Sequence, residues 1–160
     1  MLSLGLTSSQ IFKKINSNNK KFRTVSDDLK YGYGNEENVL NILNKTFNDI
    51  FINTKEKYGE YHNYDFEGTS TGLKIEMKSR RIKHDDFSTT IIPVHKCVNP
   101  NSPNLFVFYF TDGIYYIEYD KTKFEKYEIK YITSNRYNKF ENKPHYHINI
   151  EDLIKIENNS

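Results

Sequence analysis

Apolar and charged residues alternate strictly over residues 73–78. Leu73, Ile75 and Met77 are apolar, and the residues between and after them are charged. This period of two is typical of a strand that buries one face and presents polar side chains on the other. The pattern therefore predicts a strand whose polar face carries an acid and a base two positions apart.

A short segment bounded by two glycines precedes this strand and predicts a hairpin. If residues 69–72 form a four-residue loop, Gly68 pairs with Leu73. The same register places Asp65 directly opposite Glu76, where the two Cβ atoms would lie about 4.5–5.5 Å apart. The hairpin is therefore predicted to hold two carboxylates side by side.

Helical periodicity precedes the hairpin, over residues 36–47. Asn35 follows Gly32 and Gly34, and it predicts the N-cap of this helix. Glu36 lies on the inward edge of the apolar stripe, so the usual role of an acid in a first helical turn, complementing the helix dipole, accounts for it less well. The stripe consists of Val39, Leu40, Leu43 and Phe47.

The second half of the chain contains a series of strand patterns. β-Branched and aromatic runs predict strands at 87–94, 104–119, 127–133 and 145–150, the second of these a hairpin about an Asp-Gly turn, and a short helical end at 151–156. The proline-broken segment between the first two runs is too short for a good helix. One helix ahead of several strands predicts an α+β fold, with a central mixed β-sheet flanked by helices.

The length of 160 residues predicts one domain that buries its own core. We interpret residues 1–33 as an N-terminal extension, with a short helix at 9–15, and residues 34–160 as the core. The formal net charge of +2 does not by itself indicate a nucleic-acid-binding protein, so any basic surface must be local. The basic segment 13–23 is interpreted as a solvated arm, with contact to phosphates as the alternative.

A single cysteine, Cys97, excludes an internal disulfide framework and a cysteine-based zinc site. The first residues lack the basic region and long apolar run of a signal peptide. No segment approaches the roughly 18 apolar residues that a membrane span requires. We therefore expect a soluble, intracellular protein with no membrane partner.

The acids of the hairpin are the strongest candidates for chemistry. Two carboxylates at directly paired positions repel each other unless a cation lies between them. Asp65, Glu76 and the backbone carbonyl of Met77 would hold a hard cation, Mg²⁺ or alternatively Mn²⁺. Lys78 projects from the same face, where its ammonium group can orient or deprotonate a water or stabilise a phosphate transition state.

Glu-x-Lys triplets also arise by chance, and this chain contains a second one at residues 128–130, with Asp120 upstream. That triplet lacks a glycine-bounded turn, a preceding amphipathic helix and a basic segment after it. The triplet at 76–78 has all three, and its basic segment comprises Arg80, Arg81 and Lys83. Spacing alone leaves two interpretations open for 76–78, a catalytic site and plain surface charge.

The order of these features resembles the PD-(D/E)XK nuclease superfamily, whose members share the restriction-endonuclease-like fold. The resemblance is firmest over residues 34–81, and it implies a core of a helix, three strands, a helix and a strand. It implies that Asp65 and Glu76 are metal ligands and that Lys78 is the catalytic lysine. Glu36 would match the helical glutamate that supports the metal through water. The chain departs from the family pattern in having tyrosine rather than proline before the first acid, and in lacking a good second helix.

The resemblance implies a Mg²⁺-dependent deoxyribonuclease, either restriction-like or of the junction-resolvase or repair type. Such small nucleases cut as homodimers, because two DNA strands need two sites. In this interpretation Arg80, Arg81 and Lys83 contact the phosphates that flank the cut. The alternative is a non-catalytic nucleic-acid-binding or structural module that retains the fold. Cleavage of RNA is a third interpretation, because metal–phosphate chemistry does not itself choose the sugar.

Three further groups are weaker candidates. Glu67 lies on the same strand face as the first acid and is an alternative to it. His95 and Lys96 follow the third predicted strand, where the resemblance implies an extra polar active-site residue, although a surface turn is the simpler interpretation. His145 and His147 alternate on one strand face, but no third metal ligand lies near them in the sequence.

Overall fold

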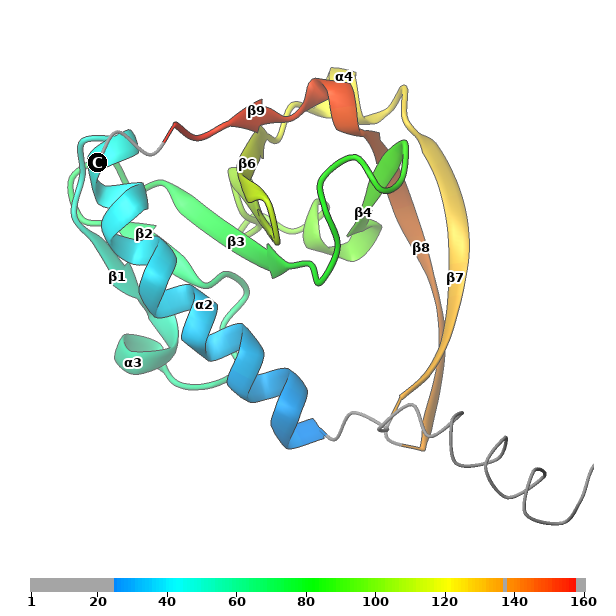
Figure 1. Ribbon diagram of the computed structural model, residues 1–160, viewed down its shortest axis with the longest axis horizontal. Coiled ribbons are helices and arrows are strands. Elements are labelled where there is room, and N and C mark those ends of the chain that lie inside the picture. Colours follow the sequence, from blue (N-terminus) through cyan, green and yellow to red (C-terminus); the bar gives the residue numbers. More distant parts are fainter. Residues whose placement is uncertain (1–24, 137, 158–160) are drawn as a thin grey trace, which may run out of the picture.

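The computed structural model describes residues 25–136 and 138–157 (Figure 1). They form a six-stranded mixed sheet, a three-stranded antiparallel sheet and a few helices, which confirms the predicted α+β class. The helix predicted at 9–15 and the basic segment 13–23 lie outside the described residues.

The six-stranded sheet carries the predicted acidic hairpin. Its strand order is β1-β2-β3-β5-β6-β9, and all neighbours are antiparallel except β3 and β5, which run parallel. The strands are β1 (Phe51–Asn53), β2 (Phe66–Gly68), β3 (Lys74–Ser79), β5 (Leu105–Phe110), β6 (Gly113–Glu118) and β9 (Ile154–Lys155). Strand β1 escapes sequence prediction because three residues are too few for a periodic signal.

Helix α2 (Val25–Thr46) covers one face of this sheet. Val39 and Leu43 are fully buried in a cluster with side chains of β2, β3 and β5, and Leu40 and Phe47 pack against it. The predicted apolar stripe is therefore confirmed. Full burial of an aliphatic side chain contributes about 1.5–3 kcal/mol to folding, so the stripe anchors the helix to the sheet.

The predicted N-cap at Asn35 is wrong, because α2 begins at Val25 and runs through both glycines without a break. A glycine inside a helix costs only about 1 kcal/mol relative to alanine, which tertiary contacts can offset. Such contacts hold the first half of the helix. Arg81 lies 3.3 Å from the Asp28 carboxylate and stacks its guanidinium over the Tyr31 ring at 4.2 Å.

A second sheet, rather than helices, covers the other face. Its order is β4 (Thr89–Pro93), β8 (Lys139–Asn149) and β7 (Glu128–Arg136). Phe106 and Phe108 of β5 share a buried cluster with Ile92 of β4 and Tyr146 of β8. Strand β4 is the strand predicted at 87–94, but it joins this second sheet. In Figure 1, β7 and β8 form a long curved ribbon on the side of the molecule away from β1 and β2.

The connection between the parallel strands β3 and β5 takes the place of a second helix. Parallel neighbours need a crossover connection, which is usually helical. Here the crossover consists of β4 and a single 3₁₀ turn, η1 (Val94–Lys96). Pro100 and Pro103 follow the turn and prevent it from extending into a helix, as the sequence predicts.

The remaining elements are short: α3 (Thr54–Tyr58), α4 (Lys121–Phe124) and the 3₁₀ turn η2 (Ile150–Asp152). The prediction of a helical end at 151–156 is wrong beyond η2. The chain there pairs with β6 as strand β9. The reason is burial, since Ile156 is 5% exposed within the same apolar cluster as the stripe of α2.

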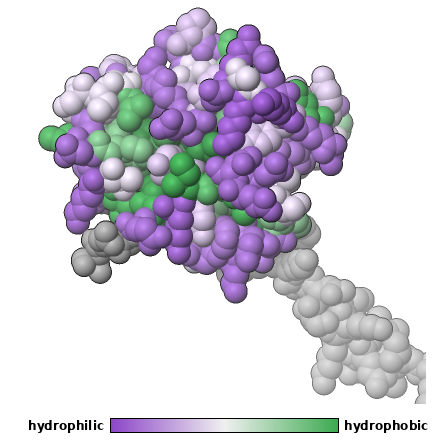
Figure 2. Space-filling view, turned by 90° about the horizontal axis from the view of Figure 1, so that it is seen from above, coloured by the Kyte–Doolittle hydropathy of each residue, from purple (hydrophilic) through white to green (hydrophobic). Residues whose placement is uncertain are grey.

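Across residues 25–136 and 138–157, no helix combines the length and the apolar character that a membrane crossing requires. Seen from above, the surface is largely hydrophilic, and apolar residues gather in a patch bordered by hydrophilic ones (Figure 2). Large apolar side chains that are at least half exposed include Ile50, Phe87, Val98 and Ile154.

Candidate active site

The predicted acids lie where β2 begins and β3 continues past it. The ladder pairs of the two strands are Phe66 with Ile75 and Glu67 with Lys74. The Gly68 N–H donates to the Leu73 carbonyl at 2.9 Å, so the loop at 69–72 and its register are as predicted. Beyond these pairs β3 runs on to Ser79. Its edge is therefore open to side chains instead of a neighbouring strand.

Asp65 occupies this open edge. Its N–H donates to the carbonyl of Ile75 at 2.9 Å, and its Oδ2 accepts from the N–H of Met77 at 2.7 Å. The carboxylate thus takes the place of a strand partner, beside Glu76 but without a ladder pair between the two. The N–H and carbonyl of one strand residue point to the same neighbour. The Met77 carbonyl therefore also faces the side where Asp65 lies.

Helix α3 fixes the backbone of Asp65. Thr54 is the first residue of that helix and is 1% exposed. Its N–H donates to the Asp65 carbonyl at 2.9 Å and its hydroxyl lies 3.1 Å from the same oxygen. The hydroxyl also donates to the carbonyl of Tyr64. These hydrogen bonds hold the acid against β3 from its own main chain.

Glu76 is the buried centre of the site. Its side chain is only 5% exposed, and two ammonium groups reach it. Lys78 donates to Oε1, and the Nζ of Lys96 lies 3.1 Å from Oε1 and 3.2 Å from Oε2. Lys96 comes from η1 on the crossover and also donates to the Asn63 carbonyl at 3.0 Å. A buried charge that loses such a partner is left uncompensated, so the three groups depend on one another.

The electrostatics of the cluster are those of crowded, buried acids. Burial and, after it, the neighbouring Glu76 raise the pKa of Asp65 to about 7. The Met77 N–H and Lys78 act in the opposite direction without outweighing the burial. An acid that keeps its proton through burial, with a second acid beside it, is a position where a cation can replace the proton.

Glu36 is a neighbour of the cluster but hydrogen-bonds elsewhere. Its Oε2 accepts from Asn53 Nδ2 at 3.3 Å. Burial raises the pKa of Glu36, and Glu76 adds to the shift, whereas Asn53 and Lys55 oppose it. Glu36 in turn raises the pKa of Asp65 by repulsion. The helical acid and the strand acids therefore share one electrostatic environment.

Two cavities flank the cluster. One, of about 840 Å³, lies between α2, β1 and α3 and is lined by Glu36. The other, of about 370 Å³, is lined by Lys78 together with residues of β4, η1, β7 and β8. Among the candidate residues, Glu36 is the one that lines the larger cavity. The smaller one is therefore the better path to the catalytic candidates.

The second Glu-x-Lys triplet, at 128–130, lies in a different environment. Glu128 and Lys130 form a pair at 3.3 Å on β7, with side chains 66% and 55% exposed. Asp120 is the N-cap of α4, where its Oδ1 accepts from the N–H of Lys123 at 2.8 Å. The structure thus separates a solvated triplet from a buried one that has a second acid beside it.

The basic residues after β3 diverge. Arg80 donates to the Ile91 carbonyl at 3.0 Å and lines the smaller cavity. Arg81 turns the other way, to the carboxylate of Asp28 on α2. Lys83 is exposed in the turn that follows. Of the three predicted phosphate contacts, Arg80 is therefore the one on the cavity wall beside the site.

The weaker candidates fall in several places. Glu67 accepts from the Tyr64 hydroxyl at 3.2 Å and pairs with Lys74, contacts that tie it to the hairpin. His145 lines the smaller cavity. The ring of His147 lies 3.4 Å from the Thr89 hydroxyl, and no group of three metal-ligating side chains among the described residues includes either histidine.

Lys96 contacts the buried Glu76, although its sequence position favours a surface turn. A surface turn is the simpler expectation for His95 and Lys96, and both residues belong to the 3₁₀ turn η1. The Lys96 side chain is nevertheless only 24% exposed, because it points inward to Glu76. The one signal for it is its position directly after a predicted strand. That signal depends on the family resemblance and not on any local pattern.

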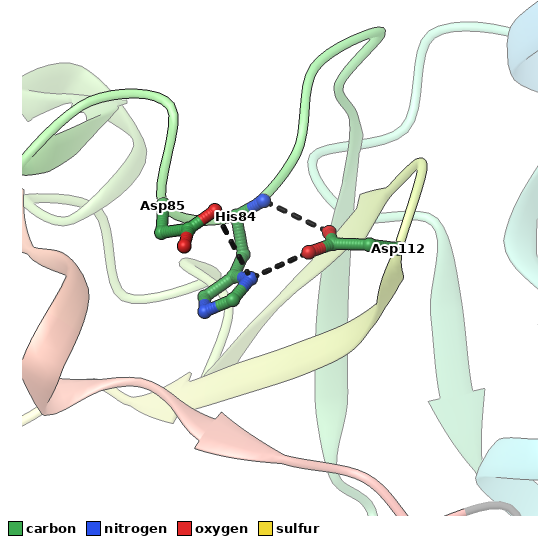
Figure 3. A group of neighbouring side chains, drawn as sticks. All are labelled: His84, Asp85 and Asp112. Atoms are coloured by element: carbon green, nitrogen blue, oxygen red, sulfur yellow. Dashed lines mark hydrogen bonds and ion pairs between the residues drawn. The ribbon is translucent and has the colours of Figure 1, made fainter.

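A separate group of potential metal ligands lies between the loop after β3 and the β5–β6 turn (Figure 3). One ligand atom each from His84, Asp85 and Asp112 fall within 4.8 Å of one another. The His84 N–H and Nδ1 both bond to Asp112, at 2.9 and 2.7 Å, and its ring stacks on Tyr115 at 4.7 Å. These contacts tie the loop to the β5–β6 turn, and we interpret the group as a loop clamp.

Comparisons with protein-family models, with curated proteins and with solved structures found no match for this chain. The interpretation of the site therefore depends on its own geometry.

Proposed function

We propose that this protein is a metal-dependent endonuclease of the PD-(D/E)XK type that hydrolyses phosphodiester bonds in DNA. The observation that carries the proposal is the buried Glu76 on β3, bonded to Lys78 two residues on, with Asp65 held beside it at the open edge of the strand. A solvated Glu-x-Lys triplet has neither the burial nor the second acid, as the one at 128–130 illustrates.

The order of the elements supports the same proposal. Helix α2, the antiparallel strands β1, β2 and β3, and the parallel strand β5 follow one another as a helix, three strands and a further strand. The family core has a second helix before its last strand, and here a strand and a 3₁₀ turn occupy that place. The acidic cluster lies on the central strands, where the family has its active site.

The donor set fits a hard divalent cation. Asp65 and Glu76 supply carboxylate oxygens, and the Met77 carbonyl faces the same side, a set that Mg²⁺ or Mn²⁺ prefers. Burial and then the neighbouring Glu76 raise the pKa of Asp65, and a cation bound between the two acids would offset both effects. When bound, the cation acts as a Lewis acid that lowers the pKa of water and neutralises charge on phosphate.

The lysines supply the remaining chemistry in this proposal. Lys78 borders the cavity and can orient the attacking water or stabilise charge on the phosphate, as a compact ammonium group does. Lys96 approaches Glu76 from η1 and holds the carboxylate of Glu76 in place. Glu36 supports the cluster from α2. We expect a homodimer, because two sites are needed to cut both strands of a duplex.

Metal binding is the first test of this proposal. Isothermal titration calorimetry with Mn²⁺ should detect binding to the wild type, and Glu76→Gln should weaken it by about 10-fold or more, because it removes a ligand charge. Glu128→Gln on the solvated triplet is the matched control and should leave binding unchanged. Equal binding by all three proteins would favour the alternative, a structural or nucleic-acid-binding module whose buried charges only hold the fold.

A further inference from the structure

A basic wall faces the candidate site across the smaller cavity. The cavity of about 370 Å³ has Lys78 of β3 and Arg80 just after it on one side and Lys143 and His145 of β8 on the other, and His95 of η1 also lines it. It therefore begins at a catalytic candidate and continues along the β7–β8 hairpin.

One face of the hairpin lines the cavity. Ile132 of β7 pairs with Lys143 of β8, and Ser134 pairs with Glu141, so all four side chains lie on the same face. Strand β7 has nine residues and β8 has eleven, a length of about 30 Å at 3.3 Å per residue. In Figure 1 the hairpin curves along the side of the molecule beside β4. This face is long enough to follow several nucleotides of an extended strand.

Positive charge exceeds negative charge along the cavity. Its lining includes Lys78, Arg80 and Lys143 and the acid Glu141. Lys78 is bonded to Glu76, but that carboxylate also contacts Lys96, so an excess of positive charge remains. The Lys143–Glu141 pair spans 3.2 Å with both side chains about half exposed, at 46% and 48%, and such a pair is weak and easily exchanged for another anion.

The lowered pKa of His95, which lines the cavity, is consistent with the same excess of positive charge. Burial lowers its pKa first, and then Lys143, Lys96, Lys78 and His145 lower it further. The three lysines come from β3, η1 and β8, so three elements direct positive charge at one place. An arrangement of this kind is stabilised by a polyanion.

We propose that this cavity and the hairpin face beyond it bind the phosphodiester backbone of the nucleic-acid substrate, with Lys143 and Arg80 contacting phosphates next to the bond that is cut. The inference depends on the proposed function for the identity of the cut. It names the ligand by chemistry, a continuous strand of phosphates, and it gives the β7–β8 hairpin the role of guiding that strand to Lys78. Glu141 is then a competitor that occupies Lys143 until the backbone displaces it.

The test is fluorescence anisotropy of a fluorescein-labelled DNA duplex in EDTA, where no cutting occurs. Lys143→Ala should raise Kd about threefold to tenfold and reduce the slope of log Kd against log salt by about one. Glu141→Gln should tighten binding instead, because it removes the competing carboxylate. Lys121→Ala is the matched control, since Lys121 also pairs with a glutamate, Glu125 at 3.7 Å, but on α4. It should bind as the wild type does.

The two proposals fail in different ways. Suppose that the wild type cuts DNA with Mg²⁺ and that Lys143→Ala and Glu141→Gln bind and cut DNA as the wild type does. The proposed role of the cavity and the hairpin face is then overturned, and the nuclease proposal stands. If DNA binding depends on Lys143 but no cutting occurs with any divalent metal, the cavity and the hairpin face keep their proposed role as a DNA-binding surface, and the nuclease proposal is overturned. The cavity and the hairpin face are not a path for a strand if the wild type binds no DNA. The same holds if inorganic phosphate, at the same concentration of phosphate groups, displaces the DNA from the wild type.

Discussion

At the residue scale, the site is defined by charges held out of water. Asp65 has an ordinary pKa of 3.8 that rises to about 7 in the folded protein, through burial and then the proximity of Glu76. A carboxyl group with a raised pKa takes up a proton on folding. Asp65 therefore weakens the fold at neutral pH in the absence of a cation, and such perturbed groups are typical of functional sites.

Replacement Asp65→Asn should stabilise the metal-free protein at alkaline pH. The folded state keeps a proton that the unfolded chain releases, so the free energy of unfolding of the wild type falls by up to about 1.4 kcal/mol per pH unit between about pH 4 and about pH 7. The free energy of unfolding of the variant lacks this pH dependence, so the variant should be more stable by up to about 4 kcal/mol at about pH 8, with no difference below about pH 4. Urea unfolding in EDTA across this range measures the effect, and parallel pH profiles for the two proteins would contradict it.

Replacement Lys96→Met tests whether Lys96 belongs to the cluster. It keeps most of the side-chain volume and leaves the buried Glu76 with Lys78 as its partner, so the free energy of unfolding should fall by about 1–3 kcal/mol. Lys121→Met, at a side chain that is 79% exposed, should change it by no more than about 0.5 kcal/mol. If Lys96→Met and Lys121→Met have the same free energy of unfolding, Lys96 is a surface-turn residue and does not belong to the cluster.

The sequence identifies Asp65, Glu76 and Lys78 because a hairpin brings neighbouring residues together by local rules. Strand alternation and a four-residue loop are enough to place them within one register. Lys96 lies 20 residues from Glu76 in the chain, and it reaches the site through a crossover whose path no local pattern specifies. Long-range contacts of this kind depend on the packing of the two sheets, which the sequence alone does not give.

At the element scale, the β2–β3 hairpin is shaped by Asp49, which no sequence pattern indicates. Its carboxylate accepts from the backbone N–H groups of Ile50, Ser70 and Thr71 at 2.7, 3.0 and 2.9 Å. The Thr71 hydroxyl and these N–H groups hold the pKa of Asp49 well below its usual range. The loop between the two acids of the site is therefore fixed from outside the hairpin.

Gly68→Ala should destabilise the protein by about 1–3 kcal/mol, because the new methyl group would clash with the carboxylate of Asp49 and the hydroxyl of Thr71. Thermal unfolding measures the change. The same variant should also reduce activity, since the loop connects the strands that carry Asp65 and Glu76. A variant as stable as the wild type would show that this clamp is not formed.

Gly34→Ala is the matched glycine substitution and should have the opposite sign. Gly34 lies inside α2, and among the described residues no atom other than its chain neighbours and the surrounding helix backbone lies within 4 Å of the position that a Cβ would occupy. Alanine in a helix interior is favoured by about 0.5–1 kcal/mol over glycine, so the melting temperature should rise. A fall would indicate that the helix breaks here, as the sequence pattern of Gly32, Gly34 and Asn35 suggests.

At the scale of the whole molecule, the sequence predicts the class of fold and the hairpin but not the layers. Periodic runs identify most strands of both sheets because each strand has its own local signal. The assignment of β4 to a second sheet is set by pairing with β8, which follows it by some fifty residues. The result is a central sheet with α2 on one face and a second sheet on the other, and the candidate site lies at the edge where β3 meets the crossover.

The central claim is that this site cuts DNA with a divalent metal, and the most direct measurement is the nicking of supercoiled plasmid by the purified protein with Mg²⁺ or Mn²⁺. The wild type, Glu128→Gln and Lys130→Met should cut alike. Glu76→Gln and Lys78→Met, with folding verified by circular dichroism, should lose about 10²-fold or more of the rate. A folded wild type that cuts nothing, or site variants that cut as fast as the wild type, would contradict the account.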